Sequence, residues 1–157
     1  MENKKEKLED FKTAISSTVR SLSNSQEIEI SFGNQAIKSS KNSIRLPDLE
    51  QGSNKLNYEK IRAIADSKSL NLRFSDVKTL KKYEPEGNIS KKLYSISEKI
   101  RCEKIGTSYF KGVKKNIEKY YYKRLSGLDL KSSEDKIIES FENYLRAVSY
   151  THLTLPT

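Results

Sequence analysis

Glu103 is the side chain in this sequence whose chemistry most needs an explanation. It falls on a line of apolar residues at helical spacing, which comprises Ile89, Leu93, Ile96, Ile100 and Phe110. A carboxylate buried without a partner costs roughly several kcal/mol, so Glu103 must meet a cation or several donors. We interpret it as a paired carboxylate that fixes helix register; a catalytic or metal-binding carboxylate is the alternative. Its expected partner is Arg73 or Arg62, from the preceding long helix.

Three further positions near this segment have polar or reactive side chains. Glu98 and Arg101 are spaced i, i+3, so they can pair on the surface of one helix. Asp66 lies on the same side of the preceding helix as Arg73. We interpret Asp66 as a structural ion-pair partner, ahead of a contact with another protein. Cys102 is predicted to be a small buried hydrophobe and not a nucleophile.

Several signatures of catalysis and of cofactor binding are absent from the sequence. There is no Gly-x-x-x-x-Gly-Lys-Ser/Thr loop to bind phosphates, so we do not expect this chain to hydrolyse ATP by itself. There is no Asp-x-Ser-x-Ser stretch of the kind found in metal-ion-dependent adhesion sites. The single cysteine excludes an internal disulfide, and a metal site would have to use carboxylates. We therefore predict no catalytic residue, no metal site and no cofactor in this chain.

The segment KGVKKNIEKYYYKRL combines basic residues with three consecutive tyrosines, Tyr120, Tyr121 and Tyr122. Such combinations can bind phosphates and stack on bases. On a helix, however, consecutive side chains point about 100° apart, so the three rings cannot form one platform. We favour a solvated helix face with one or two tyrosines in the core. The alternatives are an acidic protein partner and, less favoured, nucleic acid.

The composition describes a basic chain that suits one folded domain. It has 157 residues, 34% of them hydrophobic, and a formal net charge of +9. No window approaches the roughly 20 apolar residues of a membrane span, and no signal-like segment follows Met1. We expect a cytoplasmic protein without a membrane anchor.

The last residues of the chain read as non-native. The stretch AVSYTHLTLPT resembles the translation of a sequencing-library adapter that is joined in frame near Ala147. We therefore predict a native domain over residues 1–147 and an adapter-derived tail over residues 148–157, which includes His152. The junction implies a truncated reading frame, so the domain is expected to be part of a longer protein.

The periodicity of the apolar residues predicts a mainly α fold, in which packed long helices carry a small β-hairpin. An amphipathic helix opens the chain, and further helices are predicted over residues 58–82, around Glu103 and over residues 134–146, the last beginning at a capping box of Ser132 and Asp135. Two alternating segments between the first helices predict the paired strands of the hairpin. The expected apolar positions are Leu8, Phe11, Ile15, Val19, Leu22, Ile28, Ile30, Phe32, Ile44, Leu46, Ile61, Ala63, Ile64, Ala65, Leu70, Leu72, Phe74, Val77, Ile137, Ile138, Phe141 and Leu145.

Several short motifs follow one another in a recognisable order. They are Phe11-Lys12-x-Ala14 with Thr18 and Arg20, EIEISFG from Glu27, Arg45-Leu46-Pro47, Ala65-Asp66-Ser67 with Leu70 and Leu72, Pro85-x-Gly87, Glu98-x-x-Arg101-Cys102-Glu103-x-Ile105-Gly106, and Gly112-Val113 with Asn116. This order resembles the amino-terminal region of the T subunit of the aerobic, ATP-dependent cobaltochelatase. The resemblance covers roughly residues 11–125. It departs from the family pattern at Ser75 and Leu80, where the family has histidines.

The resemblance implies a non-catalytic part of a complex that inserts Co²⁺ into hydrogenobyrinic acid a,c-diamide during cobalamin biosynthesis, with ATP and Mg²⁺. The implied partners are an AAA+ ATPase subunit and a large tetrapyrrole-binding subunit. The structural or interface candidates are then Asp66, Arg73, Glu98, Arg101, Glu103 and Gly106. Two alternatives remain open: a small basic nucleic-acid-binding helical module, and a helical adaptor unrelated to chelation.

Overall fold

The computed structural model describes residues 2–34, 43–48, 55–125 and 132–150. Within these ranges the helices are α1 (Glu2–Ser23), α2 (Lys55–Phe74), α3 (Val77–Lys82), α4 (Asn88–Tyr109), α5 (Lys111–Leu125) and α6 (Ser133–Tyr150), and the strands are β1 (Glu29–Phe32) and β2 (Ser43–Leu46). The predicted mainly α fold with a minor β component is confirmed. None of the helices in these ranges is long and apolar enough to cross a membrane.

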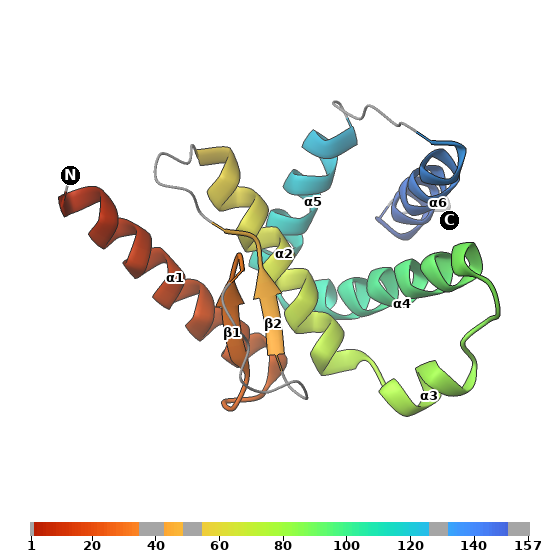
Figure 1. The fold of residues 1–157 in the computed structure, drawn as a ribbon, viewed down its shortest axis with the longest axis horizontal. Helices are drawn as coiled ribbons and strands as arrows, with labels where there is room; N and C mark the ends of the chain where they lie inside the picture. Colours follow the sequence, from red (N-terminus) through yellow and green to blue (C-terminus); the bar gives the residue numbers. More distant parts are fainter. Residues whose placement is uncertain (1, 35–42, 49–54, 126–131, 151–157) are drawn as a thin grey trace, which may run out of the picture.

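Helix α2 lies at the centre of the structure. It contacts α1 and β2 on one side and α4 and α5 on the other (Figure 1). Helix α6 packs on α4, and Figure 1 places it at the opposite end of the molecule from α1. The fold is therefore a series of layers in which α2 and α4 are each covered on two sides.

The first apolar cluster joins α1, the strands and the first half of α2. Its buried members are Leu8, Ile15, Val19, Ile28, Phe32, Ile44, Leu46, Ile61 and Ala65. The predicted apolar line of α1 is confirmed, because Leu22 is buried as well and Phe11 packs edge-to-face on Tyr58 with 4.7 Å between ring centroids. Burial of apolar area in this cluster is what holds α1 on α2.

The two strands form as predicted, but the hairpin interpretation is wrong. Strands β1 and β2 pair in parallel, with Glu29 opposite Ser43 and Phe32 opposite Leu46. Alternation of apolar and polar residues specifies which side chains face the core, but it does not specify strand direction. A parallel pair needs a crossover connection instead of a tight turn. Ten residues, 33–42, connect the two strands, and of these residues 35–42 lie outside the described part of the chain.

The single helix predicted over residues 58–82 is divided into α2 and α3. Asp76 caps α3: its carboxylate accepts hydrogen bonds from the Lys78 backbone N–H at 3.0 Å and from the Thr79 hydroxyl at 2.6 Å. An aspartate side chain that bonds to nearby backbone in this way competes with helix continuation. Two predicted core positions are solvent-exposed, Leu72 of α2 at 41% and Val77 of α3 at 60%.

Helix α6 begins as predicted but buries a different face. The Ser132 hydroxyl accepts a hydrogen bond from the Asp135 backbone N–H at 3.0 Å, which confirms the cap. The residues of α6 that are buried are polar: Glu139, Glu142 and Arg146. Ile137, predicted for the apolar face, is 52% exposed, and the other predicted apolar residues of this helix are half-buried. The helix continues to Tyr150, into the predicted tail; residues 151–157 lie outside the described part.

A second apolar cluster joins the ends of α1 and α2 to α5. It consists of Leu22, Leu70, Val113 and Ile117, with Phe74, Phe110 and Tyr121 packed against it. Gly106 of α4 brings α4 close to α2 beside this cluster. A Cβ added at Gly106 would lie 2.8 Å from Leu70 Cγ and closer still to its methyl groups. The α2–α4 crossing therefore requires glycine for space.

We predict that Gly106→Ala destabilises the domain by about 1–3 kcal/mol, because the new methyl group overpacks against Leu70. Gly112→Ala is a matched control, since a Cβ added at Gly112 meets nothing within 4 Å. Better helix propensity should make the control neutral or up to about 1 kcal/mol more stable. Urea unfolding measures both. Equal midpoints for the two variants would contradict the close crossing, and in a Leu70→Ala background the cost of Gly106→Ala should largely disappear.

Candidate functional site

Glu103 lies at a junction of three helices. Its side chain is 0% exposed. From α6, Arg146 Nη1 donates to Glu103 Oε2 at 2.5 Å and Nη2 contacts Oε1 at 3.4 Å; from α2, the Ser67 hydroxyl donates to Oε1 at 2.5 Å. The predicted burial of Glu103 and its pairing with a basic residue are confirmed. The predicted partner was wrong, because it is Arg146 and neither Arg73 nor Arg62.

Arg73 has other partners at the end of α2. It donates from Nη1 to the Leu22 backbone carbonyl at 3.2 Å, and its guanidinium lies over the rings of Phe74 and Phe110 at 5.6 and 5.5 Å. Arg73 thus joins α2 to the ends of α1 and α4. The face of α2 that meets Glu103 carries a hydroxyl and no cation.

A second carboxylate, Glu142, shares Arg146 with Glu103. Glu142 Oε1 accepts from Arg146 Nη2 at 2.9 Å and from Lys99 Nζ at 2.9 Å. Burial acts to raise the pKa of Glu142, but the charges and hydrogen bonds of Lys99 and Arg146 prevail and lower it to about 2. Two carboxylates and two cations therefore meet in one group whose formal charges cancel, and all of them except the half-buried Lys99 are buried.

Tyr121 of α5 completes this group. Its ring centroid lies 3.3 Å from Arg146 Cζ and 5.3 Å from Lys99 Nζ, so the ring covers both cations. This agrees with the interpretation that one or two tyrosines of the basic segment belong to the core; Tyr122 is exposed. We call the resulting set the Glu103 cluster: Ser67, Lys99, Glu103, Tyr121, Glu142 and Arg146.

The geometry of the Glu103 cluster suits a structural role, in which it holds the helices together, better than a catalytic role in proton transfer. Both carboxylates are buried and are already bonded to cations, so neither is open to a reacting group. Sequence reasoning missed Lys99, Glu142 and Arg146. A signal was present, because Glu142 and Arg146 are spaced i, i+4 on one helix, where opposite charges pair. What that spacing does not reveal is that the pair faces inward.

The predicted pair of Glu98 and Arg101 forms on α4. Arg101 Nε and Nη2 donate to the two carboxylate oxygens of Glu98 at 2.7 and 2.8 Å, and Nη2 also donates to the Phe74 carbonyl at 2.7 Å. The hydrogen bond from Arg101 is the main reason that the pKa of Glu98 falls to about 2. This pair joins α4 to the last residue of α2. Next to it, Cys102 is buried as predicted, and burial raises the pKa of its thiol to about 12.

Asp66 has a neutral partner where an ion pair was predicted. It is 1% exposed, and its Oδ2 accepts from the Asn116 side-chain amide at 2.8 Å. Its Oδ1 has no hydrogen-bond partner. Burial raises the pKa of Asp66, opposed by the Asn116 hydrogen bond and the charge of Arg62. Arg73 therefore does not pair with Asp66, which instead links α2 to α5.

Comparison with protein families identifies one match. The family described as cobalamin biosynthesis protein CobT matches residues 5–145, which include most of α1, all of α2 to α5 and most of α6. No solved structure matches the chain. Within the described ranges, no three His, Cys, Asp or Glu side chains come together in a group that could hold a metal ion.

We predict that Glu103→Ala lowers the free energy of unfolding by about 3–5 kcal/mol, because it leaves Arg146 buried without its main partner. Glu103→Gln keeps the shape of the side chain and one hydrogen bond, so it should lower the free energy of unfolding by less than Glu103→Ala does. The exposed pair of Lys91 and Glu84 provides the control: Glu84→Ala should cost less than about 1 kcal/mol. Denaturant titration checks the order, and an unchanged midpoint for Glu103→Ala would show that the pair does not stabilise the fold.

The low pKa of Glu142 predicts a loss of stability in acid. Its pKa is about 2 in the folded chain against an ordinary 4.5, so its contribution is complete above about pH 4.5 and is lost as the pH falls towards 2. Glu142→Gln should flatten the plot of unfolding free energy against pH across this window. Part of the slope should remain, because Glu98 also has a pKa near 2. If Glu142→Gln keeps the full wild-type slope, the pairing with Lys99 and Arg146 does not lower this pKa.

Proposed function

This chain belongs to the family of the cobalamin biosynthesis protein CobT, and we propose that it is a non-catalytic region of the cobaltochelatase complex. Its role therefore lies in cobalamin biosynthesis. In the proposed reaction, the complex inserts Co²⁺ into hydrogenobyrinic acid a,c-diamide at the expense of ATP. The single observation that carries the proposal is the family match over residues 5–145, and the order of motifs from Phe11 to Asn116 supports it.

A scaffolding role is consistent with how the charged residues are used. The cations and carboxylates of the Glu103 cluster are bonded to one another across α4 and α6, and the Glu98–Arg101 pair is bonded to the end of α2. Interactions of this kind fix the positions of helices that a partner can recognise. We propose that ATP and Mg²⁺ act on an AAA+ ATPase subunit, that a large subunit holds the tetrapyrrole, and that assembly takes place in the cytoplasm.

A nucleic-acid-binding module is less well supported. Such a module would need aromatic rings free to stack on bases beside its basic residues. Tyr121 instead stacks on Arg146, and Tyr120 packs on Tyr121 with 5.1 Å between ring centroids. Among the described tyrosines of this segment, only Tyr122 is exposed, so the structure offers no continuous stacking surface there.

We predict that the purified chain shows no ATP turnover and no cobalt insertion, whereas the natural full-length protein co-purifies with its AAA+ subunit. Reconstitution with the AAA+ and large subunits, omitting one component at a time, tests this. Cobalt insertion should require all three, measured by the absorbance change of the corrinoid. ATP hydrolysis by the chain alone would contradict the assignment. Full cobalt insertion by the AAA+ and large subunits without this protein would contradict it too.

A further inference from the structure

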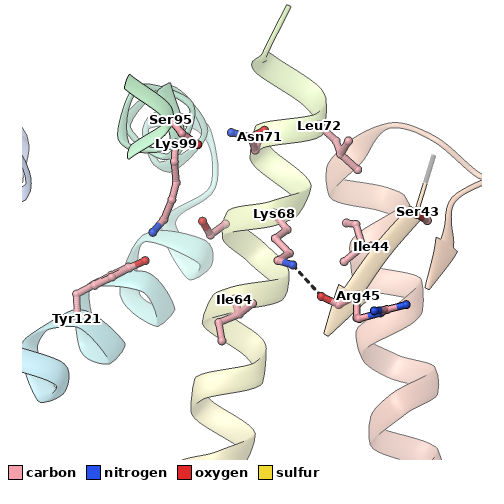
Figure 2. A pocket seen from close by; sticks show the side chains of 11 residues that line it. Ser43, Ile44, Arg45, Ile64, Lys68, Asn71, Leu72, Ser95, Lys99 and Tyr121 are labelled. Carbon is pink, nitrogen blue, oxygen red and sulfur yellow. Dashed lines mark hydrogen bonds between the residues drawn. The ribbon is translucent and has the colours of Figure 1, made fainter. Parts of the chain in front are cut away.

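A groove crosses the exposed face of α2. Figure 2 shows α2 in the middle, β2 along one side, and α4 with α5 along the other. The cavity has a volume of about 420 Å³, within the range of sites that bind ligands or the side chains of a peptide. It borders the Glu103 cluster, because Ser67, Lys99 and Tyr121 line it, but the buried carboxylates Glu103 and Glu142 do not.

The charge of this groove is positive and is only partly compensated. Arg45, Lys68 and Lys99 line it, and none of the lining residues in the described part of the chain is an Asp or a Glu. Lys99 is paired with Glu142, but Arg45 and Lys68 form no salt bridge with any carboxylate in the described part of the chain. Burial and the nearby charge of Arg45 both lower the pKa of Lys68. A bound anion would relieve this repulsion between like charges.

No strand in the described part of the chain pairs with the edge of β2 beside these cations. Among the described residues the sheet has two strands, so β2 pairs with β1 along one edge alone. The Leu46 carbonyl accepts from the Gly33 N–H on the β1 side. Because carbonyls alternate along a strand, the Arg45 carbonyl points the other way, and there it accepts from Lys68 Nζ at 2.8 Å (Figure 2). An open strand edge can pair with the backbone of an extended peptide.

We propose that this groove binds an extended acidic segment of a partner protein, with its carboxylates at Arg45 and Lys68 and its backbone along the open edge of β2. The strand edge favours a peptide over a free phosphate, which has no backbone to pair. The apolar side chains of Ile44, Ile64 and Leu72 also line the groove and would contact the alternate side chains of the segment. This proposal does not depend on the cobaltochelatase assignment.

The test uses the full 157-residue chain and a labelled ten-residue peptide in which Asp and Glu alternate with Val. Fluorescence anisotropy at physiological salt measures its affinity. The double variant Arg45→Gln/Lys68→Gln should weaken binding at least about tenfold, since it removes two charge-assisted contacts. The double variant Lys81→Gln/Lys82→Gln removes the same charge from the exposed surface of α3 and should change the affinity less than about twofold.

Three further checks make the result decisive. Circular dichroism must show wild-type helicity for both double variants, and Lys68→Arg should retain most of the affinity because it keeps the charge. In NMR spectra, the amides of Ser43 and Arg45 should shift when the peptide binds. The proposal fails if both double variants weaken binding equally, if a peptide with Asn and Gln in place of the acids binds as well, or if millimolar inorganic phosphate or a single-stranded oligonucleotide displaces the acidic peptide completely.

Discussion

The arrangement of α2, α4 and α6 depends on how the charge of Glu103 is compensated inside the protein. Glu103 can only be buried if Arg146 and Ser67 reach it together, from α6 and α2. Removing two charges from water costs several kcal/mol for each ion, so the net gain in stability over apolar residues of the same volume is small. The larger effect is on specificity. A shift of either neighbouring helix by one turn would leave a buried charge without its partner, and such packings are disfavoured strongly.

Helix α2 contributes side chains both to the two apolar clusters and to the buried hydrogen bonds of Glu103 and Asn116. Its first half packs into the cluster with α1 and the strands, and Leu70 belongs to the second cluster near its end. The same helix provides Ser67 to Glu103 and Asp66 to Asn116. Apolar burial supplies most of the driving force, and the polar side chains select one register among the packings that apolar burial alone would allow. Close contact at Gly106 restricts the choice further.

The features that could be predicted from the sequence are those that one helix or one strand contains. The apolar line of α1, the cap of α6 and the pair of Glu98 and Arg101 all follow from spacing within a single element. The burial of Glu103 could also be inferred, since its own helix shows the line it occupies. Its partner could not be inferred, because Arg146 is 43 residues away and an arginine nearer in sequence satisfies the same chemical requirement. The direction of strand pairing could not be predicted either, because the alternation of apolar and polar side chains is the same for parallel and antiparallel pairs.

Helix α6 differs from the others in what attaches it. In the described part of the chain, neither apolar cluster contains a residue of α6, and its most buried side chains are Glu139, Glu142 and Arg146. Detachment of α6 from the rest of the domain would therefore leave both clusters intact. The free energy of this local opening should be well below the free energy of global unfolding. Backbone amides of α6 would then exchange with solvent ahead of those in α2. We therefore expect two levels of cooperativity in the domain: an apolar centre that opens as one unit, and an outer helix that buried ion pairs attach to it.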